Sequence, residues 1–94
     1  MELDSEWDDV KAEENLRKHN VSFEEAASVF GDPMMLVASD LEHSDRELRW
    51  KLTGTSEKSR LLVVVYARRG ERVRIISARR PSMREVREYV AAQD

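Results

Sequence analysis

The sequence predicts an α+β fold in which helices pack on one face of an antiparallel sheet. Apolar residues in the first third of the chain recur every three or four positions, as in helices, whereas those of residues 47–79 alternate or run continuously, as in strands. Two predicted strands are joined by residues 68–71 alone, and so short a link cannot cross over to a parallel neighbour. A last helical pattern follows Pro81, which ends the sheet.

The chain is expected to begin with a short strand over residues 3–7 and a helix over about residues 9–19. Asp8 is a suitable N-cap for this helix, because its carboxylate can accept hydrogen bonds from the first turn. Acidic residues stand early in the helix and basic residues late, as the helix dipole favours. Asn20 can adopt the left-handed conformation that ends a helix.

A second helix and a third short element follow. Ser22 and Glu25 have the spacing of a capping box at the start of the second helix, which Gly31 ends. Residues 34–38 are a short apolar run, which predicts a strand. Its two methionines fit either the sheet core or an adaptable docking edge, and we favour the core. Residues 40–45 form a polar, acidic loop.

The second half of the chain predicts the remaining strands. Residues 47–53 alternate between apolar and polar side chains, as in a half-buried strand. Residues 61–67 are continuously apolar, which predicts the central strand, and residues 72–79 form the last strand beside it. Ser82 and Glu85 make a second capping box, at the start of a C-terminal helix. The order is therefore strand, helix, helix, three or four antiparallel strands and helix, with a cationic sheet face opposite the helices.

Length and composition limit the class of protein. The 94 residues predict a single domain over residues 1–94. The lack of cysteine excludes a disulfide framework, a thiolate zinc site and a cysteine nucleophile. No apolar run approaches the roughly 18 residues of a membrane span. The acidic residues 1–20 are also unlike a signal peptide. We therefore expect a cytoplasmic protein that makes no contact with a membrane.

The net charge of −3 conceals a marked asymmetry. Residues 1–47 contain four basic and fourteen acidic residues, whereas residues 48–94 contain twelve basic and five acidic ones. Twelve of the sixteen basic residues are arginine, whose planar guanidinium suits phosphate and carboxylate groups. The asymmetry indicates a nucleic-acid surface or an acidic partner, unless the two halves neutralise each other within one salt-bridged domain.

The residues that could carry chemistry are mostly arginines. No motif of phosphate loops, zinc proteases or serine hydrolases occurs, and His19 and His43 lack ligand spacing, so we expect no metal and no cofactor. Arginines gather on the predicted strands and the last helix: Arg49, Arg74, Arg79, Arg80, Arg84 and Arg87. Such groups can bind RNA phosphates and stabilise the charge that develops during phosphoryl transfer. Glu85 or Tyr89 could transfer protons, although spacing alone favours capping and packing.

Two groups of residues carry a resemblance to a known family. The first group is Glu6-Trp7-Asp8, Lys11-Ala12, Asn15, Lys18-His19 and Val21-Ser22-Phe23-Glu24-Glu25-Ala26. The second group is Asp40, His43-Ser44, Glu47, Arg49, residues 61–65 and 74–79, Glu85 and Tyr89. Together they span most of the chain and resemble the BrnT toxin family. The helical signature and the R-I-I-S-A-R strand are the most specific parts.

The resemblance implies a RelE-like ribonuclease fold and a toxin of a type II toxin–antitoxin pair, which stops translation by cutting RNA. The implied partner is a small, DNA-binding, BrnA-like antitoxin, so operator DNA is contacted only through the complex. Matching positions make the following residues catalytic candidates: Arg49, Arg74, Arg79, Glu85 and Tyr89. The candidates for RNA binding are Lys18, His43, Lys51 and Arg80. Asp9 and Pro81 depart from the family pattern, and Pro81 alters the approach to the last helix.

The favoured function is therefore a metal-independent endoribonuclease. The alternative is a non-catalytic module that binds the antitoxin and acts as a co-repressor. Direct DNA binding by the arginines is less favoured, because proteins that read duplex DNA usually carry a recognition helix. Growth arrest on expression without the antitoxin would separate the first function from the second.

Overall fold

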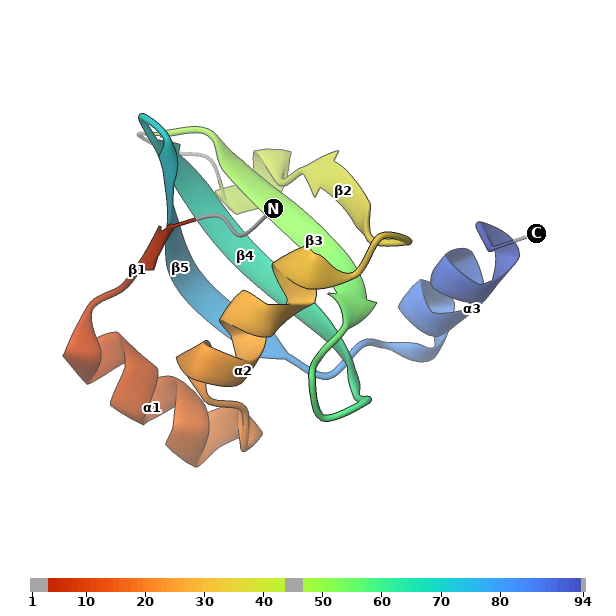
Figure 1. Cartoon of the computed structure of the whole chain (residues 1–94), viewed down its shortest axis with the longest axis horizontal. Helices are drawn as coiled ribbons and strands as arrows, with labels where there is room; N and C mark the ends of the chain where they lie inside the picture. Colours follow the sequence, from red (N-terminus) through yellow and green to blue (C-terminus); the bar gives the residue numbers. More distant parts are fainter. Residues whose placement is uncertain (1–3, 44–46, 94) are drawn as a thin grey trace.

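The computed structural model describes residues 4–43 and 47–93, apart from the side chain of His43. A short strand and two helices come first, further strands follow and a helix ends the chain (Figure 1). The elements are β1 (Ser5–Glu6), α1 (Asp9–His19), α2 (Phe23–Ser28), the 3₁₀ turn η1 (Val29–Gly31), β2 (Leu36–Ser39), the 3₁₀ turn η2 (Leu41–His43), β3 (Arg49–Thr55), β4 (Leu61–Arg69), β5 (Arg72–Arg79) and α3 (Met83–Ala91). The predicted α+β class and the predicted order of elements are confirmed.

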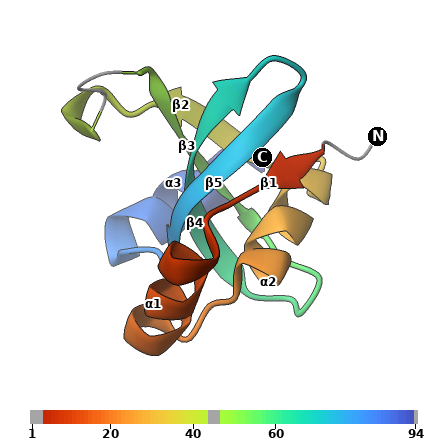
Figure 2. The same cartoon turned by 90° about the vertical axis from the view of Figure 1, so that its left-hand side faces the viewer.

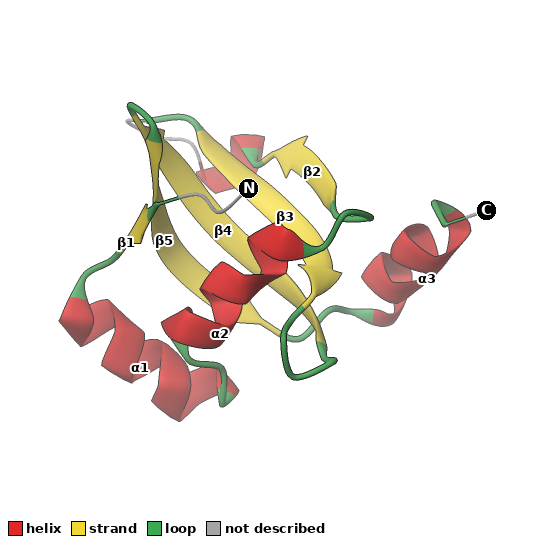
Figure 3. Cartoon of the chain, viewed as in Figure 1, coloured by secondary structure: helices red, strands yellow, loops and turns green. Residues whose placement is uncertain are grey.

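One five-stranded sheet, in the order β1-β5-β4-β3-β2, contains the strands of the described residues (Figure 3). Strands β2 to β5 pair antiparallel with their neighbours, as predicted. The predicted count of three or four strands is not confirmed, because the short β1 also joins the sheet. It pairs in parallel with β5, where Ser5 and Glu6 lie opposite Val73 and Arg74.

The helices lie on both faces of the sheet, so the prediction of one helical face was wrong. α1 and α2 cover one face, and α3 lies on the other (Figures 1 and 2). Side chains alternate along β3, so that Leu52 is buried with Phe23 of α2, whereas Lys51 on the opposite face meets Glu85 of α3. The apolar stripe of α3 predicts a packed helix, but it carries no information about which sheet face receives it.

The hydrophobic core fills the space between the sheet and the first two helices. Its large, fully buried apolar side chains are Val21, Phe23, Val29, Leu52, Leu62, Val64, Val73 and Ile75. Trp7 meets Phe23 edge to face, with ring centroids 6.0 Å apart. Trp50 packs against the same cluster, as its phase in the alternating strand predicts.

Two of the helices begin where their capping residues predict. The Asp8 carboxylate accepts a hydrogen bond from the N–H of Val10 (3.1 Å), and α1 ends at Asn20, whose φ of 57° lies in the left-handed region. At the start of α3, Ser82 and Glu85 form the complete capping box. This capping box holds the Glu85 carboxylate at the first turn of α3.

The capping box predicted at α2 is only half present. Ser22 Oγ accepts from the N–H of Glu25 (3.0 Å), but the Glu25 carboxylate is buried beside the turn between β3 and β4. There it accepts from Ser56 Oγ (2.7 Å) and Arg60 Nε (2.9 Å), and it also contacts Arg60 Nη2. The hydrogen bond from Arg60 outweighs the effect of burial and lowers the pKa of Glu25 to about 2. This ion pair ties α2 to the sheet.

The apolar run after α2 does not enter the core as favoured. Met34 is 46% exposed and Met35 is 37% exposed, because β2 begins only at Leu36 and forms the edge of the sheet. Leu48 is likewise 49% exposed, because β3 begins after it, at Arg49. The sequence patterns thus locate these two strands but begin each of them two residues too early.

Asn15 fixes α1 against β5. Its side chain is buried, and Nδ2 donates to the carbonyl oxygens of Val21 (2.9 Å) and Ala78 (2.9 Å). Its Oδ1 accepts from the N–H of Ala78 (3.0 Å). The amide group therefore pairs with β5 as a neighbouring strand would. β1 makes this kind of pairing at Val73 and Arg74, and Asn15 provides it farther along the same strand.

Candidate functional site

The sheet face opposite α1 and α2 carries three rows of side chains across β3, β4 and β5. The rows are Arg49, Ala67 and Arg74; then Lys51, Val65 and Ser77; then Thr53, Val63 and Arg79. Alanine and valine of β4 occupy the middle of each row, and the cations stand on β3 or β5. Adjacent strands lie about 4.8 Å apart, so cations on β3 and β5 are separated by about 10 Å at their Cα atoms. The middle of this sheet face is therefore apolar, and cations stand on the strands at either side of it.

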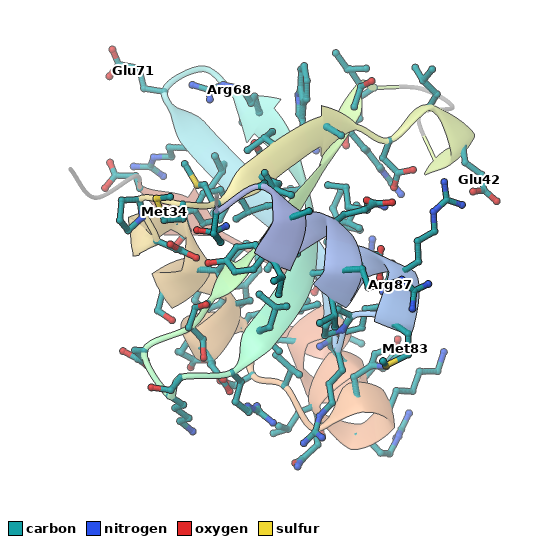
Figure 4. The ribbon with its side chains drawn as sticks, turned by 90° about the vertical axis from the view of Figure 1, so that its right-hand side faces the viewer. Met34, Glu42, Arg68, Glu71, Met83 and Arg87 are labelled. Carbon is teal, nitrogen blue, oxygen red and sulfur yellow. The ribbon has the colours of Figure 1, made fainter. Side chains whose placement is uncertain are left out.

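A hollow of about 290 Å³, here called the sheet-face hollow, opens above this floor. Its lining comes from β3, β4, β5 and the segment after β2: Asp40, Glu42, Arg49, Lys51, Val65, Ile76, Ser77 and Arg79. Figure 4 shows Glu42 projecting from that segment. A neighbouring hollow of about 530 Å³ at α3 shares Lys51 and Arg79 with it. Three cations and two carboxylates thus line one depression.

Arg79 and Lys51 are both held by Glu85 of α3. Arg79 Nη1 and Nη2 donate to Glu85 Oε1 (2.8 Å) and Oε2 (3.0 Å), and Lys51 Nζ donates to Oε2 (3.1 Å). The N–H of Ser82 also donates to Oε1 (2.8 Å), which completes the capping box. A two-point ion pair of this kind restricts the guanidinium to one orientation. The last helix therefore determines where the Arg79 side chain points.

The same contacts set the charge of Glu85. The hydrogen bonds from Arg79 hold the pKa of Glu85 far below its usual range, although partial burial opposes them. The pKa of Arg79 is raised in return, chiefly by its hydrogen bonds to Glu85. A general base works best with a pKa near the working pH. Glu85 is thus better suited to position Arg79 than to accept a proton.

Tyr89 lies away from the arginines and anchors the second half of α3. Its hydroxyl donates to Asp32 Oδ2 (2.6 Å) and lies 3.3 Å from Thr55 Oγ1. The hydrogen bond to Asp32 raises the pKa of Tyr89, so the hydroxyl stays protonated. Burial of Asp32 favours its neutral form, but hydrogen bonds from Tyr89 and from the N–H groups of Thr55 and Met34 lower its pKa overall. These contacts give Tyr89 a structural role in the fold.

Arg74 shares a row with Arg49, but it does not line the sheet-face hollow. Its Nη1 donates to Glu6 Oε2 of β1 at 2.9 Å. Arg74 thus stands at the β1 side of the sheet, outside the group that Glu85 organises. Of the predicted cations, Arg49, Lys51 and Arg79 come together around the sheet-face hollow.

The remaining predicted RNA-binding residues lie on different elements. Lys18 is an exposed residue of α1, and Arg80 is exposed directly after β5. The carbonyl oxygen of Arg80 accepts a hydrogen bond from Arg79 Nη1 (3.2 Å). The backbone of His43 belongs to η2, but its side chain lies outside the described residues.

Five residues of the sheet-face hollow did not enter the sequence-based site: Asp40, Glu42, Val65, Ile76 and Ser77. The acidic run after β2 was the available signal for the first two, because carboxylates next to predicted arginines are candidate proton acceptors. Ile76 and Ser77 left no signal, because alternation does not reveal the local irregularity of β5 at these positions.

The described residues lack the features of two other classes of site. Over residues 4–43 and 47–93, with the side chain of His43 left aside, no group of three or more His, Asp or Glu side chains is placed to hold a metal ion. In the same part of the chain, no helix has the length and apolar character needed to cross a membrane.

The fold and the hollow define a small α+β protein with a hollow on its sheet face that is lined by three cations and two carboxylates. Residues 7–85 match the family described as "Ribonuclease toxin, BrnT, of type II toxin-antitoxin system". The chain therefore belongs to the BrnT family of ribonuclease toxins of type II toxin–antitoxin systems. The resemblance drawn from the sequence is confirmed.

A solved structure supports the fold independently. The 1.1 Å crystal structure of the Brucella abortus ribonuclease toxin, BrnT, superposes with a TM-score of 0.66 at 19% sequence identity. The alignment covers 86% of this chain and 99% of the Brucella protein. At this identity the match establishes the shared fold, and the RelE-like classification stays a prediction. No curated protein matches the chain in sequence.

Proposed function

We propose that the protein is a metal-independent endoribonuclease whose catalytic centre is the sheet-face hollow. The observation that carries this proposal is the grouping of Arg49, Lys51 and Arg79 with the carboxylates of Asp40 and Glu42 around one hollow. Guanidinium and ammonium groups bind phosphate, and carboxylates can accept a proton. Membership of a family of ribonuclease toxins supports the same function.

The proposed reaction is attack by a ribose 2′-hydroxyl on the adjacent phosphorus, which releases the 5′-oxygen of the next nucleotide. Arg79 stabilises the negative charge that develops on the phosphoryl oxygens, because Glu85 has already fixed its direction. Arg49 and Lys51 bind the same phosphate from the β3 side. Asp40 or Glu42 takes the 2′-hydroxyl proton. The leaving 5′-oxygen takes its proton from solvent water, and His43 stays a candidate for RNA binding.

RNA cleavage by the purified protein is expected to continue in excess EDTA. Arginine side chains can provide the charge stabilisation that a divalent ion provides in metal-dependent nucleases. The measurement is the loss of a labelled RNA on a denaturing gel, together with growth arrest and RNA loss in cells that express the toxin alone. Complete inhibition by EDTA, reversed by a divalent ion, would refute metal independence. A non-catalytic co-repressor would cut no RNA and arrest no growth.

The proposed cellular role follows the family. Cleavage of RNA in the cytoplasm stops translation, and a BrnA-like DNA-binding antitoxin neutralises the toxin by covering the cationic sheet face. Operator DNA is then bound through the antitoxin of the complex. Electrostatic attraction between the arginines and an acidic or amphipathic antitoxin segment accelerates capture.

Association with the antitoxin is expected to slow as the salt concentration rises, and to slow further in the double variant Arg49→Ala, Arg74→Ala. Both arginines stand in one row of the sheet face, and salt screens the attraction between exposed charges. The measurement is the association rate against salt concentration. The matched control is Arg68→Ala, Arg72→Ala, which removes two exposed arginines near the β4–β5 turn. An unchanged, salt-insensitive rate for the first variant would mean that the antitoxin docks elsewhere.

A further inference from the structure

A third hollow, here called the α1–β5 hollow, has a volume of about 250 Å³ and lies between α1 and β5. Besides the buried Asn15, its lining consists of Lys11, Glu14, Lys18, His19, Ile76 and Ser77. The α1 residues recur at the three- and four-residue spacing that places side chains on one stripe of a helix. The hollow therefore presents a cationic helix stripe opposite the edge of the sheet.

The lysines of this stripe are available to an external anion. Lys11 and Lys18 are exposed, and neither makes an ion pair with any of the described residues. The other cations near the proposed catalytic centre differ: Lys51 and Arg79 pair with Glu85, and Arg74 pairs with Glu6. A bound phosphate would replace no internal partner at the two lysines.

The α1–β5 hollow adjoins the sheet-face hollow. Ile76 and Ser77 line both. Ile76 is the extra residue of a β-bulge, because Tyr66 pairs with Ile75 and Val65 pairs with Ser77. A bulge bends its strand and redirects a side chain, and bulges are frequent beside active sites. Here the bulge places the apolar side chain of Ile76 where the two hollows meet.

We propose that the α1–β5 hollow is a second nucleotide subsite, which binds the RNA nucleotide next to the cleaved phosphate. This inference rests on the proposed function. Lys11 and Lys18 bind the outer phosphate of that nucleotide, and Ile76 packs against its base. Ser77 Oγ and the His19 ring supply hydrogen bonds to the base edge or the 2′-hydroxyl. A strand of RNA that leaves the sheet-face hollow over the edge of β5 must pass this surface.

The size and lining of the hollow favour a single-stranded ribonucleotide. Pockets for drug-sized ligands range from about 300 to 1,000 Å³, so 250 Å³ suits one nucleotide. Single-strand sites combine a cationic groove for the backbone with aromatic side chains for the bases. Here Ile76 provides an apolar contact in place of an aromatic ring. Glu14 adds a hydrogen-bond acceptor to the cationic lining. Its carboxylate can therefore accept hydrogen bonds from the donor groups of a base.

The test compares two RNA substrates. One is a dinucleotide with a single phosphodiester bond, and the other is an octanucleotide that contains the same dinucleotide. For Lys11→Ala, Lys18→Ala, kcat/KM is expected to fall at least tenfold more for the octanucleotide than for the dinucleotide. The control Arg68→Ala, Arg72→Ala removes the same charge from the β4–β5 turn and is expected to match the wild type on both. The salt dependence for the octanucleotide should also weaken by about 0.7 logarithmic units per decade, because the two lysines neutralise one phosphate and each neutralised phosphate contributes about 0.7.

Binding of an octanucleotide blocked by 2′-O-methylation separates this inference from the proposed function. Weaker binding by the lysine variant than by the control supports the subsite, even where the wild type cuts no RNA. Equal losses on both substrates would place the lysines at the cleaved phosphate itself, and unchanged values would leave the hollow without a role in RNA binding; either result overturns the proposal. Loss of antitoxin binding without any change in RNA binding also overturns it, because the hollow would then be a protein-docking surface.

Discussion

Replacement of Arg79 by alanine is expected to lower the rate of RNA cleavage by about 10²–10³-fold, the usual loss when one preorganised transition-state donor is removed. Arg79 lines the sheet-face hollow, and its two contacts with Glu85 fix its guanidinium before substrate binds. The measurement is kcat/KM on a defined RNA, with growth arrest as the cellular readout. Thermal unfolding of the variant shows whether it remains folded.

Arg87→Ala is the matched control for this prediction. Arg87 belongs to the same helix as Glu85, is exposed, and projects from the outer side of α3 (Figure 4). It lines none of the three hollows described above. Its replacement should leave cleavage near the wild-type rate. If Arg79→Ala and Arg87→Ala were equally toxic, the assignment of Arg79 would be wrong.

Arg60→Ala is expected to lower the free energy of unfolding at neutral pH by about 3 kcal/mol, because removal of one partner leaves a buried charge without compensation. Glu25 is 1% exposed, and Arg60 is its cationic partner. The measurement is denaturant unfolding, with Arg87→Ala as the exposed control. The double variant Glu25→Gln, Arg60→Ala should recover part of the loss, because no buried charge remains.

The loss caused by Arg60→Ala should depend on pH in a defined direction. In the wild type the folded-state pKa of Glu25 is lowered from 4.5 to about 2, so its ion pair stabilises the fold above pH 4.5. This contribution disappears as the pH falls through 2, where Glu25 becomes protonated. The stability difference between wild type and variant should therefore narrow from pH 4.5 towards pH 2. A constant difference across this range would show that the effect arises from lost packing alone.

Local sequence signals predicted the elements of this fold because each depends on a few neighbouring residues. Asp8, Asn20 and the pair Ser82 and Glu85 are found at the helix ends as expected. Local signals could not predict which sheet face α3 covers or which strand β1 pairs with, because both depend on contacts between segments far apart in the chain. Glu25 illustrates the conflict: its local spacing indicates a capping box, but Arg60, thirty-five residues later, provides a stronger partner.

Only those parts of the candidate site that depend on local sequence patterns could be predicted. Arg49, Lys51 and Arg79 lie on strands whose outward face follows from alternation, so their grouping could be foreseen. The sequence left open whether Glu85 only caps the last helix or also transfers protons. In the structure Glu85 caps α3 and also accepts hydrogen bonds from Arg79. Tyr89 matched a family position, but its contact with Asp32 depends on a turn that no periodicity describes.

The side-chain amide of Asn15 has a consequence for the behaviour of the chain in a crowded solution. An outer strand with free N–H and C=O groups invites pairing with another molecule, which is a common route to aggregation. Along β5, β1 occupies this position at Val73 and Arg74, and Asn15 satisfies both backbone groups of Ala78. A single polar side chain from α1 thereby discourages the addition of a strand from another molecule at this end of β5. The chain needs no further strand of its own to protect that position.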